Sequence, residues 1–180
     1  MAARTAFLTA FVGRRQEIED VARAVQDHHL VTLIGVGGLG KTRLANEALD
    51  RLADRFGERV WVAELADLQD PALVGHLVSA AMDAPSPGEV FDPAALVAFV
   101  GDGPGLLLLD NCEHLLEASA ALATALLRGC PGLHVLTTSR QRLGVTGEHL
   151  YPVPSLDAED AAALFGARAL AAAPGWVADP

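Results

Sequence analysis

The stretch that most constrains the fold is a glycine-rich octapeptide in the first quarter of the chain. Residues 35–42 read G-V-G-G-L-G-K-T and match the pattern G-x-x-x-x-G-K-[ST] at every specified position. They follow a short apolar run, Leu30–Ile34, and overlap the start of Lys41–Phe56, where leucine and alanine recur at helical spacing. The sequence therefore predicts a buried strand, a tight glycine loop and a helix in direct succession.

Such a loop is suited to holding phosphate. Glycines let successive backbone N–H groups turn inward around an anion, and the following helix points the positive end of its dipole to the same place. Lys41, the only lysine in the chain, is expected to bridge the terminal phosphates, and the Thr42 hydroxyl is expected to help coordinate Mg²⁺. The predicted cofactors are ATP or ADP with Mg²⁺, and the predicted contacts are Gly35, Gly37, Gly38, Leu39, Gly40, Lys41, Thr42 and Arg43.

The rest of the chain alternates strand patterns with helix patterns. Further strands are predicted over 59–65, 106–110, 133–138 and 150–153, and helices over 15–26, 71–82, 93–100, 115–127 and 157–173. This alternation is typical of a parallel sheet covered by helices on both faces. The 180 residues suffice for one well-buried core, so we expect a single α/β domain over residues 1–180.

Composition excludes several classes of protein. Asp and Glu number 23 against 13 Lys and Arg, and a formal charge of −10 has the wrong sign for direct binding to nucleic acid. No apolar run approaches the roughly 18 residues that a membrane span needs, and the first residues do not resemble a secretion signal. Cys112 and Cys130 lack metal-site spacing, so we expect buried free thiols in a soluble, cytoplasmic protein without membrane contact.

A single carboxylate ends the apolar run of four leucines that begins at Leu106. Ligands of parallel sheets lie beyond the carboxyl ends of the strands, so Asp110 is expected to hold Mg²⁺, usually through water. The alternative is that Asp110 caps a helix beginning near Cys112. Asn111 follows, at the position where many ATPases with an extra strand between the phosphate loop and this aspartate carry an acidic residue. An amide can orient water but cannot accept its proton. Glu113 is the nearest other base, for which we expect a surface or capping role.

The strand predicted over 133–138 also ends in polar residues. Thr137, Thr138 and Ser139 are followed by Arg140, at the edge where the phosphates are expected. Arg140 is therefore a candidate sensor of the γ-phosphate, the group that distinguishes ATP from ADP. The alternative is a solvated arginine in a turn.

Taken together, four segments resemble the STAND class of signalling ATPases, and most of all the NB-ARC-like module of bacterial transcriptional regulators of the LuxR and AfsR type. The segments are Phe11–Arg14, the loop at residues 35–42, residues 106–114 and Thr137–Arg140. The resemblance implies a five-stranded parallel P-loop NTPase sheet of the ASCE type, in which the strand ending at Arg140 separates the strand of Asp110 from that of the loop. It also implies that Val12 and Arg14 lie near the adenine and ribose, and that nucleotide exchange is a switch with slow hydrolysis as its reset.

The chain departs from that family in what it lacks. The family continues into a helical segment containing Gly-Leu-Pro and a winged helix that close over the nucleotide, and neither occurs before Pro180. We therefore expect the core of a longer regulator, monomeric by itself, with oligomerisation left to the whole protein. Two alternatives stay open: a P-loop kinase or energetically driven ATPase, and an interaction domain with a vestigial loop.

Overall fold

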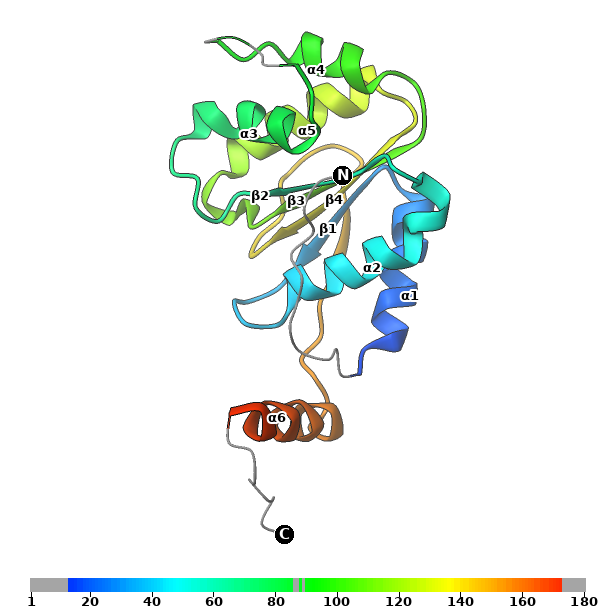
Figure 1. The fold of residues 1–180 in the computed structure, drawn as a ribbon, viewed down its shortest axis with the longest axis vertical. Helices are drawn as coiled ribbons and strands as arrows, with labels where there is room; N and C mark the ends of the chain where they lie inside the picture. Colours follow the sequence, from blue (N-terminus) through cyan, green and yellow to red (C-terminus); the bar gives the residue numbers. More distant parts are fainter. Residues whose placement is uncertain (1–12, 86–87, 89, 173–180) are drawn as a thin grey trace.

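The computed structural model describes residues 13–85, 88 and 90–172, and these form a parallel sheet between two layers of helices (Figure 1). The strands lie in the order β2-β3-β4-β1-β5, and every neighbouring pair is parallel. Their bounds are β1 Leu30–Ile34, β2 Val60–Glu64, β3 Gly105–Asp110, β4 Leu133–Ser139 and β5 His149–Pro152. Strand β4 lies between β1 and β3, so the strand order implied by the resemblance is confirmed.

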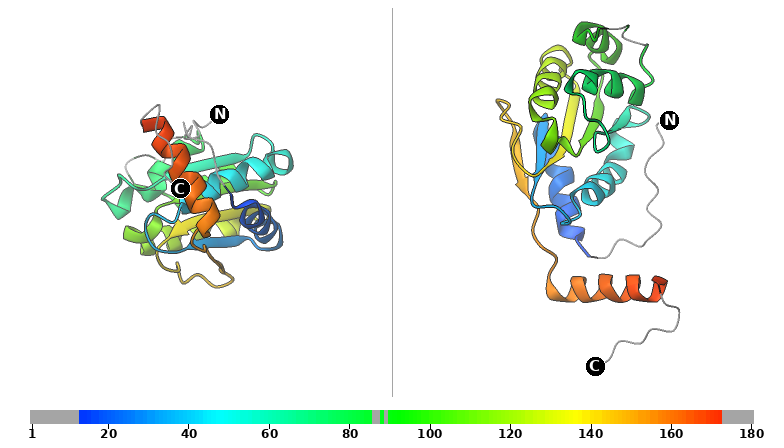
Figure 2. Two further views of the ribbon diagram at one scale, coloured as in Figure 1. Left: turned by 90° about the horizontal axis from the view of Figure 1, so that it is seen from below. Right: turned by 90° about the vertical axis from the view of Figure 1, so that its left-hand side faces the viewer.

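The helices cover both faces of the sheet. One face packs against α1 and α2, and the other packs against α3, α4 and α5 (Figures 1 and 2). A last helix, α6, lies apart from these layers, beyond the carboxyl ends of the strands. The bounds are α1 Arg15–Asp27, α2 Lys41–Phe56, α3 Val74–Ala81, α4 Pro93–Val100, α5 Leu116–Gly129 and α6 Ala158–Ala172. No helix among the described residues has the length and apolar character of a membrane span.

The leucines of β3 show why this strand is central. Leu106 and Leu108 belong to the core cluster under α1 and α2, whereas Leu107 and Leu109 belong to the cluster under α3, α4 and α5. Side chains of a strand alternate between its two faces, so an unbroken apolar run fits a strand that is buried on both sides. The same run would give a helix an apolar surface all round, which this position could not bury.

Two predicted helices begin differently in the structure. The segment predicted as one helix over 71–82 is a 3₁₀ turn, Pro71–Leu73, followed by α3, and Asp70 accepts a hydrogen bond from the N–H of Ala72 at 2.9 Å. The helix predicted from Leu115 begins at Leu116 and follows a second 3₁₀ turn, Cys112–His114. In both places a tight 3₁₀ turn precedes the regular helix, which begins three residues later than predicted in the first case and one residue later in the second.

Four of the six histidines meet at the amino edge of the sheet, opposite the glycine loop. The rings of His28 and His149 stack with centroids 4.1 Å apart, and those of His29 and His134 stack at 4.6 Å. Burial lowers the pKa of His134 and of His149 below the usual value. Protonation would place a charge inside each stack, so this edge of the sheet is best packed when the imidazoles are neutral.

We expect the free energy of unfolding to fall as the pH is lowered. A lowered histidine pKa means that the folded chain binds fewer protons than the unfolded chain between that pKa and about 6.5, so stability is present above this window and is lost through it. Thermal unfolding measured between about pH 7.5 and pH 5.5 should show a drop in Tm, where 1 kcal/mol corresponds to about 2–4 °C. The variant His149→Phe keeps an aromatic ring that can stack on His28 but cannot be protonated, so its Tm should drop less over the same pH range.

The buried Asp110 contributes to this pH dependence with the opposite sign, because its pKa is raised. Its contribution is common to the unsubstituted protein and to His149→Phe, so it cancels in the comparison. Equal slopes of Tm against pH in the two proteins would show that protonation of His149 does not affect stability.

Candidate nucleotide-binding site

The glycine loop leaves β1 at the carboxyl edge of the sheet and enters α2 through a left-handed turn. Gly38 and Gly40 have φ of 82° and 79°, a region in which a side chain is strained. Gly40 is the N-cap of α2, and within the described part of the chain no side chain caps this helix. Its first turn, which begins Lys41-Thr42-Arg43, holds no acidic residue. The first amides of α2 are therefore left for an external anion.

Lys41 lies folded over this loop. Its side chain is buried, with 7% of its surface exposed, and the ammonium donates to the carbonyl oxygens of Gly35 at 2.8 Å and Val36 at 3.1 Å. Leu39 packs back against the core below α1 and α2 and fills the space beside Gly35, where a methyl group would collide with it. The only lysine side chain of the protein is thus held at the loop, where a phosphate could replace the carbonyls as its partner.

Asp110 and Thr42 meet on the other side of the loop, although 68 residues separate them. The Thr42 hydroxyl lies 2.9 Å and 3.0 Å from the two carboxylate oxygens, and the Thr138 hydroxyl donates to Oδ1 at 2.6 Å. Oxygen ligands of this kind suit Mg²⁺, and both residues predicted as metal ligands are in direct contact. The donor set therefore fits the ion.

The electrostatics of Asp110 favour a cation beside it. The carboxylate is 5% exposed, and burial raises its pKa, while hydrogen bonds from Thr138 and Thr42 lower it and the charges of Glu64 and Glu113 raise it further. A buried negative charge is costly unless it is paired. Mg²⁺ next to Asp110 would supply the missing positive charge.

Asn111 turns the chain out of β3. It adopts a left-handed conformation with φ of 65°, and its N–H donates to the Thr138 hydroxyl at 2.9 Å. The short turn that follows has no side-chain cap among the described residues, and the carboxylate of Asp110 bonds to Thr42 and Thr138 instead. The alternative that Asp110 serves as a helix cap is therefore wrong.

Arg140 lies over the loop but is engaged by a carboxylate. Its Nε donates to Oε1 of Glu113 at 3.0 Å, and a methyl group added to Gly37 would lie 3.3 Å from its Nη2. The expected capping role of Glu113 is wrong, because its side chain, 18% exposed, pairs with Arg140 and caps neither the 3₁₀ turn nor α5. The contact joins residues 27 positions apart, and sequence reasoning missed it. The same holds for the part that Thr138 plays between Asp110 and Asn111.

Glu148 is a further residue that the sequence did not single out. Its carboxylate accepts hydrogen bonds from the Thr32 hydroxyl at 2.6 Å and from the N–H groups of Leu143 and Gly144, both at 2.8 Å. These bonds tie the segment that follows Arg140 to the buried middle of β1. A lone glutamate near two glycines gave no signal of this role.

Arg14 is buried at the start of α1, at 7% exposure, with a left-handed φ of 60°. Its Nη2 donates to the carbonyl oxygen of Pro154 at 2.9 Å, whereas its Nη1 is buried and has no hydrogen-bond partner among residues 13–85, 88 and 90–172. A hollow of about 470 Å³ lies beside it, lined also by Gly13, Ile18 and Glu47. Val12, the other residue predicted to lie near the base, falls outside the described residues.

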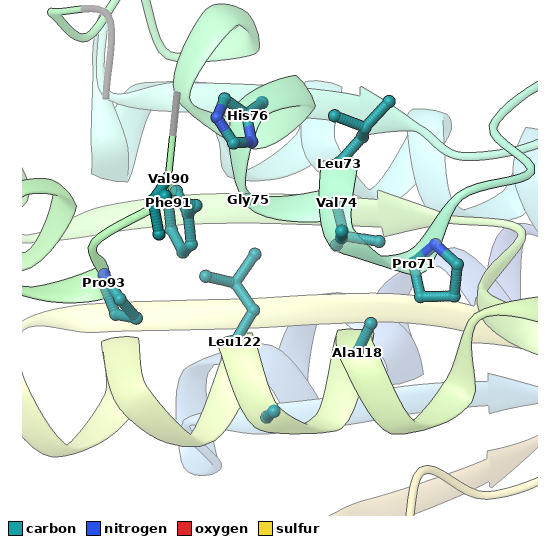
Figure 3. A pocket seen from close by; sticks show the side chains of 12 residues that line it. Pro71, Leu73, Val74, Gly75, His76, Val90, Phe91, Pro93, Ala118 and Leu122 are labelled. Carbon is teal, nitrogen blue, oxygen red and sulfur yellow. The ribbon is translucent and has the colours of Figure 1, made fainter. Parts of the chain in front are cut away.

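A second hollow, of about 510 Å³, lies between α3, α5 and the segment before α4 (Figure 3). Its lining includes Leu73, Val74, Phe91 and Leu122. None of the described residues that line it is a lysine, an arginine or a carboxylate. Its chemistry does not suit a polyphosphate, so the glycine loop remains the candidate site.

Comparison with known sequences connects the chain to longer mycobacterial proteins. It is 42% identical over 163 residues to an uncharacterized protein of Mycobacterium tuberculosis, a match that covers 90% of this chain and 42% of that protein. It is 39% identical over 150 residues to a second protein of the same organism, named "putative HTH-type transcriptional regulator", covering 83% of this chain and 17% of that protein. The chain thus spans less than half of either relative. No model of a protein family matches it.

Comparison with solved structures decides the fold. One similar structure is that of the ORC2 protein of Aeropyrum pernix, solved in ADPNP and ADP complexes, with a TM-score of 0.63 and 18% identity. The match covers 92% of this chain and 54% of the ORC2 chain. A STAND protein with a tetratricopeptide repeat sensor from Pyrococcus horikoshii matches 95% of this chain and 26% of its own, with a TM-score of 0.51 and 18% identity. The fold is that of a P-loop NTPase. At this identity the likeness concerns the fold alone.

Proposed function

We propose that the chain is the nucleotide-binding core of a STAND-type regulatory ATPase, in which bound ATP or ADP with Mg²⁺ sets the state of a larger protein. The observation that carries this proposal is the meeting of Lys41, the uncapped start of α2 and the Thr42–Asp110 pair at one edge of the sheet. A phosphate tail, a divalent cation and their counter-charges would all find partners there. The mycobacterial relative named as an HTH-type regulator supports a role in transcription.

The proposed function gives a separate role to the loop amides, to Lys41, to the Thr42–Asp110 pair and to two arginines. Main-chain amides from Gly38 to Thr42 hold phosphate oxygens, and the ammonium of Lys41 exchanges its loop carbonyls for the terminal phosphates. Thr42 and Asp110 would hold Mg²⁺, which neutralises phosphate charge when bound. Arg14, whose Nη1 is buried without a hydrogen-bond partner among the described residues, contacts the nucleoside end of the nucleotide. Arg43, half-buried in the first turn of α2, contacts the phosphate end.

Hydrolysis by this site is expected to be slow, because Asn111 stands where a carboxylate could accept the proton of the attacking water. Phosphate release by the purified chain with ATP and Mg²⁺ should stay below about one per second, the lower end of ordinary enzymes. Asn111→Asp supplies a carboxylate, and aspartate tolerates the left-handed backbone there, so this variant should release phosphate at least about tenfold faster.

The same assay separates the alternatives. Several turnovers per second by the unsubstituted chain would favour a driven ATPase, and phosphate transfer to an added small acceptor would favour a kinase. An identical rate in Asn111→Asp would contradict the role given to this position. Extraction of freshly purified protein, followed by chromatography, should recover ADP or ATP.

A further inference from the structure

The pair formed by Arg140 and Glu113 lies beside the proposed phosphate site and is separate from Lys41, the loop amides and the Thr42–Asp110 pair. Arg140 follows the end of β4, and Glu113 lies in the 3₁₀ turn after β3, so two neighbouring strand ends bring them together. Their Nε and Oε1 atoms are 3.0 Å apart. The side chain of Arg140 is 65% exposed, and that of Glu113 is 18% exposed. The arginine side chain therefore has solvent around it into which it could move, whereas the glutamate side chain is largely enclosed.

The backbone around Glu113 explains why its carboxylate points inward. The left-handed Asn111, anchored by the bond from its N–H to Thr138, directs the 3₁₀ turn back toward the end of β4. Oε2 of Glu113 is buried and accepts no hydrogen bond within the part of the chain that the structure describes. Within the described residues, Arg140 is thus the counter-charge of a carboxylate that is largely out of water, and the hydrogen bond between them is charge-assisted.

The same guanidinium borders the phosphate loop. Its Nη2 lies against Gly37, at a distance that leaves room for glycine but hardly for a Cβ atom. Arg140 therefore stands between two places for an anion: the carboxylate of Glu113, and the phosphate that the loop would hold. A single guanidinium with its Nε committed to Glu113 cannot give its full set of donors to a phosphate.

We propose that Glu113 is a specificity-determining residue that competes with the terminal phosphate of ATP for Arg140, and thereby limits the preference of the site for ATP over ADP. The inference rests on the proposed function, because it needs nucleotide in the loop. ADP lacks the γ-phosphate and leaves the Arg140–Glu113 pair intact. ATP must break this pair before its γ-phosphate can contact Arg140, so part of the affinity that this contact provides is lost.

The test is the ratio of affinities for ADP and for a non-hydrolysable ATP analogue, both with Mg²⁺, measured by calorimetric titration. Glu113→Gln keeps the shape of the side chain and removes its charge, so the preference for the ATP analogue should rise about two- to fivefold, the range of a partly exposed ion pair. The affinity for ADP should change less. Glu117→Gln, at an exposed position four residues further on, removes the same charge and should leave the ratio unchanged.

A second background separates competition from simple repulsion between Glu113 and the phosphates. In Arg140→Ala the carboxylate of Glu113 has no guanidinium to pair with, so adding Glu113→Gln should leave the ratio of affinities unchanged. A ratio that falls or stays constant in Glu113→Gln alone, or that rises equally in both backgrounds, would overturn the inference while nucleotide binding itself stands. Absence of nucleotide binding by the unsubstituted chain would overturn the proposed function together with the inference.

Discussion

Replacing Lys41 with alanine is expected to weaken the binding of ATP and ADP about ten- to a hundredfold, since a charge-assisted contact contributes roughly 1.5–3 kcal/mol. The structure gives this variant a defined effect, because the buried ammonium already lies within 3.1 Å of two loop carbonyls and no second lysine can replace it. Calorimetric titration with each nucleotide measures the change. Lys41→Met, which keeps the aliphatic stem, should lose as much affinity and so show that the charge is responsible.

The matched control for this substitution is Arg128→Ala, which removes one positive charge from an exposed residue in the last turn of α5. The control should bind nucleotide like the unsubstituted protein. Unfolding curves of all these proteins show whether each variant is folded. Equal affinities in Lys41→Ala and in the unsubstituted chain would contradict the assignment of the loop.

The second large effect is expected at Asp110. Asp110→Asn should remove most of the gain in ATP affinity that Mg²⁺ provides, by about 10- to 100-fold, the usual cost of losing a partner that orients the water shell of a metal. Titrations with Mg²⁺ and with a chelator measure this gain. The binding of metal-free nucleotide should change little, because the loop and Lys41 remain.

The same variant should make the nucleotide-free protein more stable at neutral pH. Burial raises the pKa of Asp110, so the charged form is disfavoured in the folded state, whereas an amide oxygen still accepts from Thr42 and Thr138. A higher Tm without nucleotide together with a lost Mg²⁺ effect is the expected signature. Glu117→Gln, which removes a carboxylate from an exposed position in the first turn of α5, is the control. An unchanged Mg²⁺ effect in Asp110→Asn would exclude the metal role.

Local signals in the sequence sufficed for the core of the site. The strand Leu30–Ile34, the helix Lys41–Phe56 and the helix Pro93–Val100 are confirmed at both ends, because apolar periodicity and flanking glycine or proline mark them without any distant contact. The parallel sheet followed from the alternation of strands and helices. The position of β4 between β1 and β3 came only from the family resemblance, since spacing carries no information on strand order.

Contacts between distant residues were beyond reach of the sequence. The pairing of Glu113 with Arg140 depends on how the ends of β3 and β4 lie side by side, and on the left-handed turn at Asn111. The stacked histidines at the opposite edge depend in the same way on the register of β1 with β4 and β5. Such features arise from tertiary packing, which overrides any local pattern of residues.

The proposed function depends most on main-chain amides near Gly38 and Gly40 that surround a polyphosphate. A crystal structure of the chain grown with ADP and Mg²⁺ tests this most directly. We expect phosphate oxygens within hydrogen-bonding distance of the N–H groups from Gly38 to Thr42, with the ammonium of Lys41 turned from the loop carbonyls to the β-phosphate. A nucleotide bound elsewhere, or a loop that keeps Lys41 on its own carbonyls at saturating ADP, would contradict it.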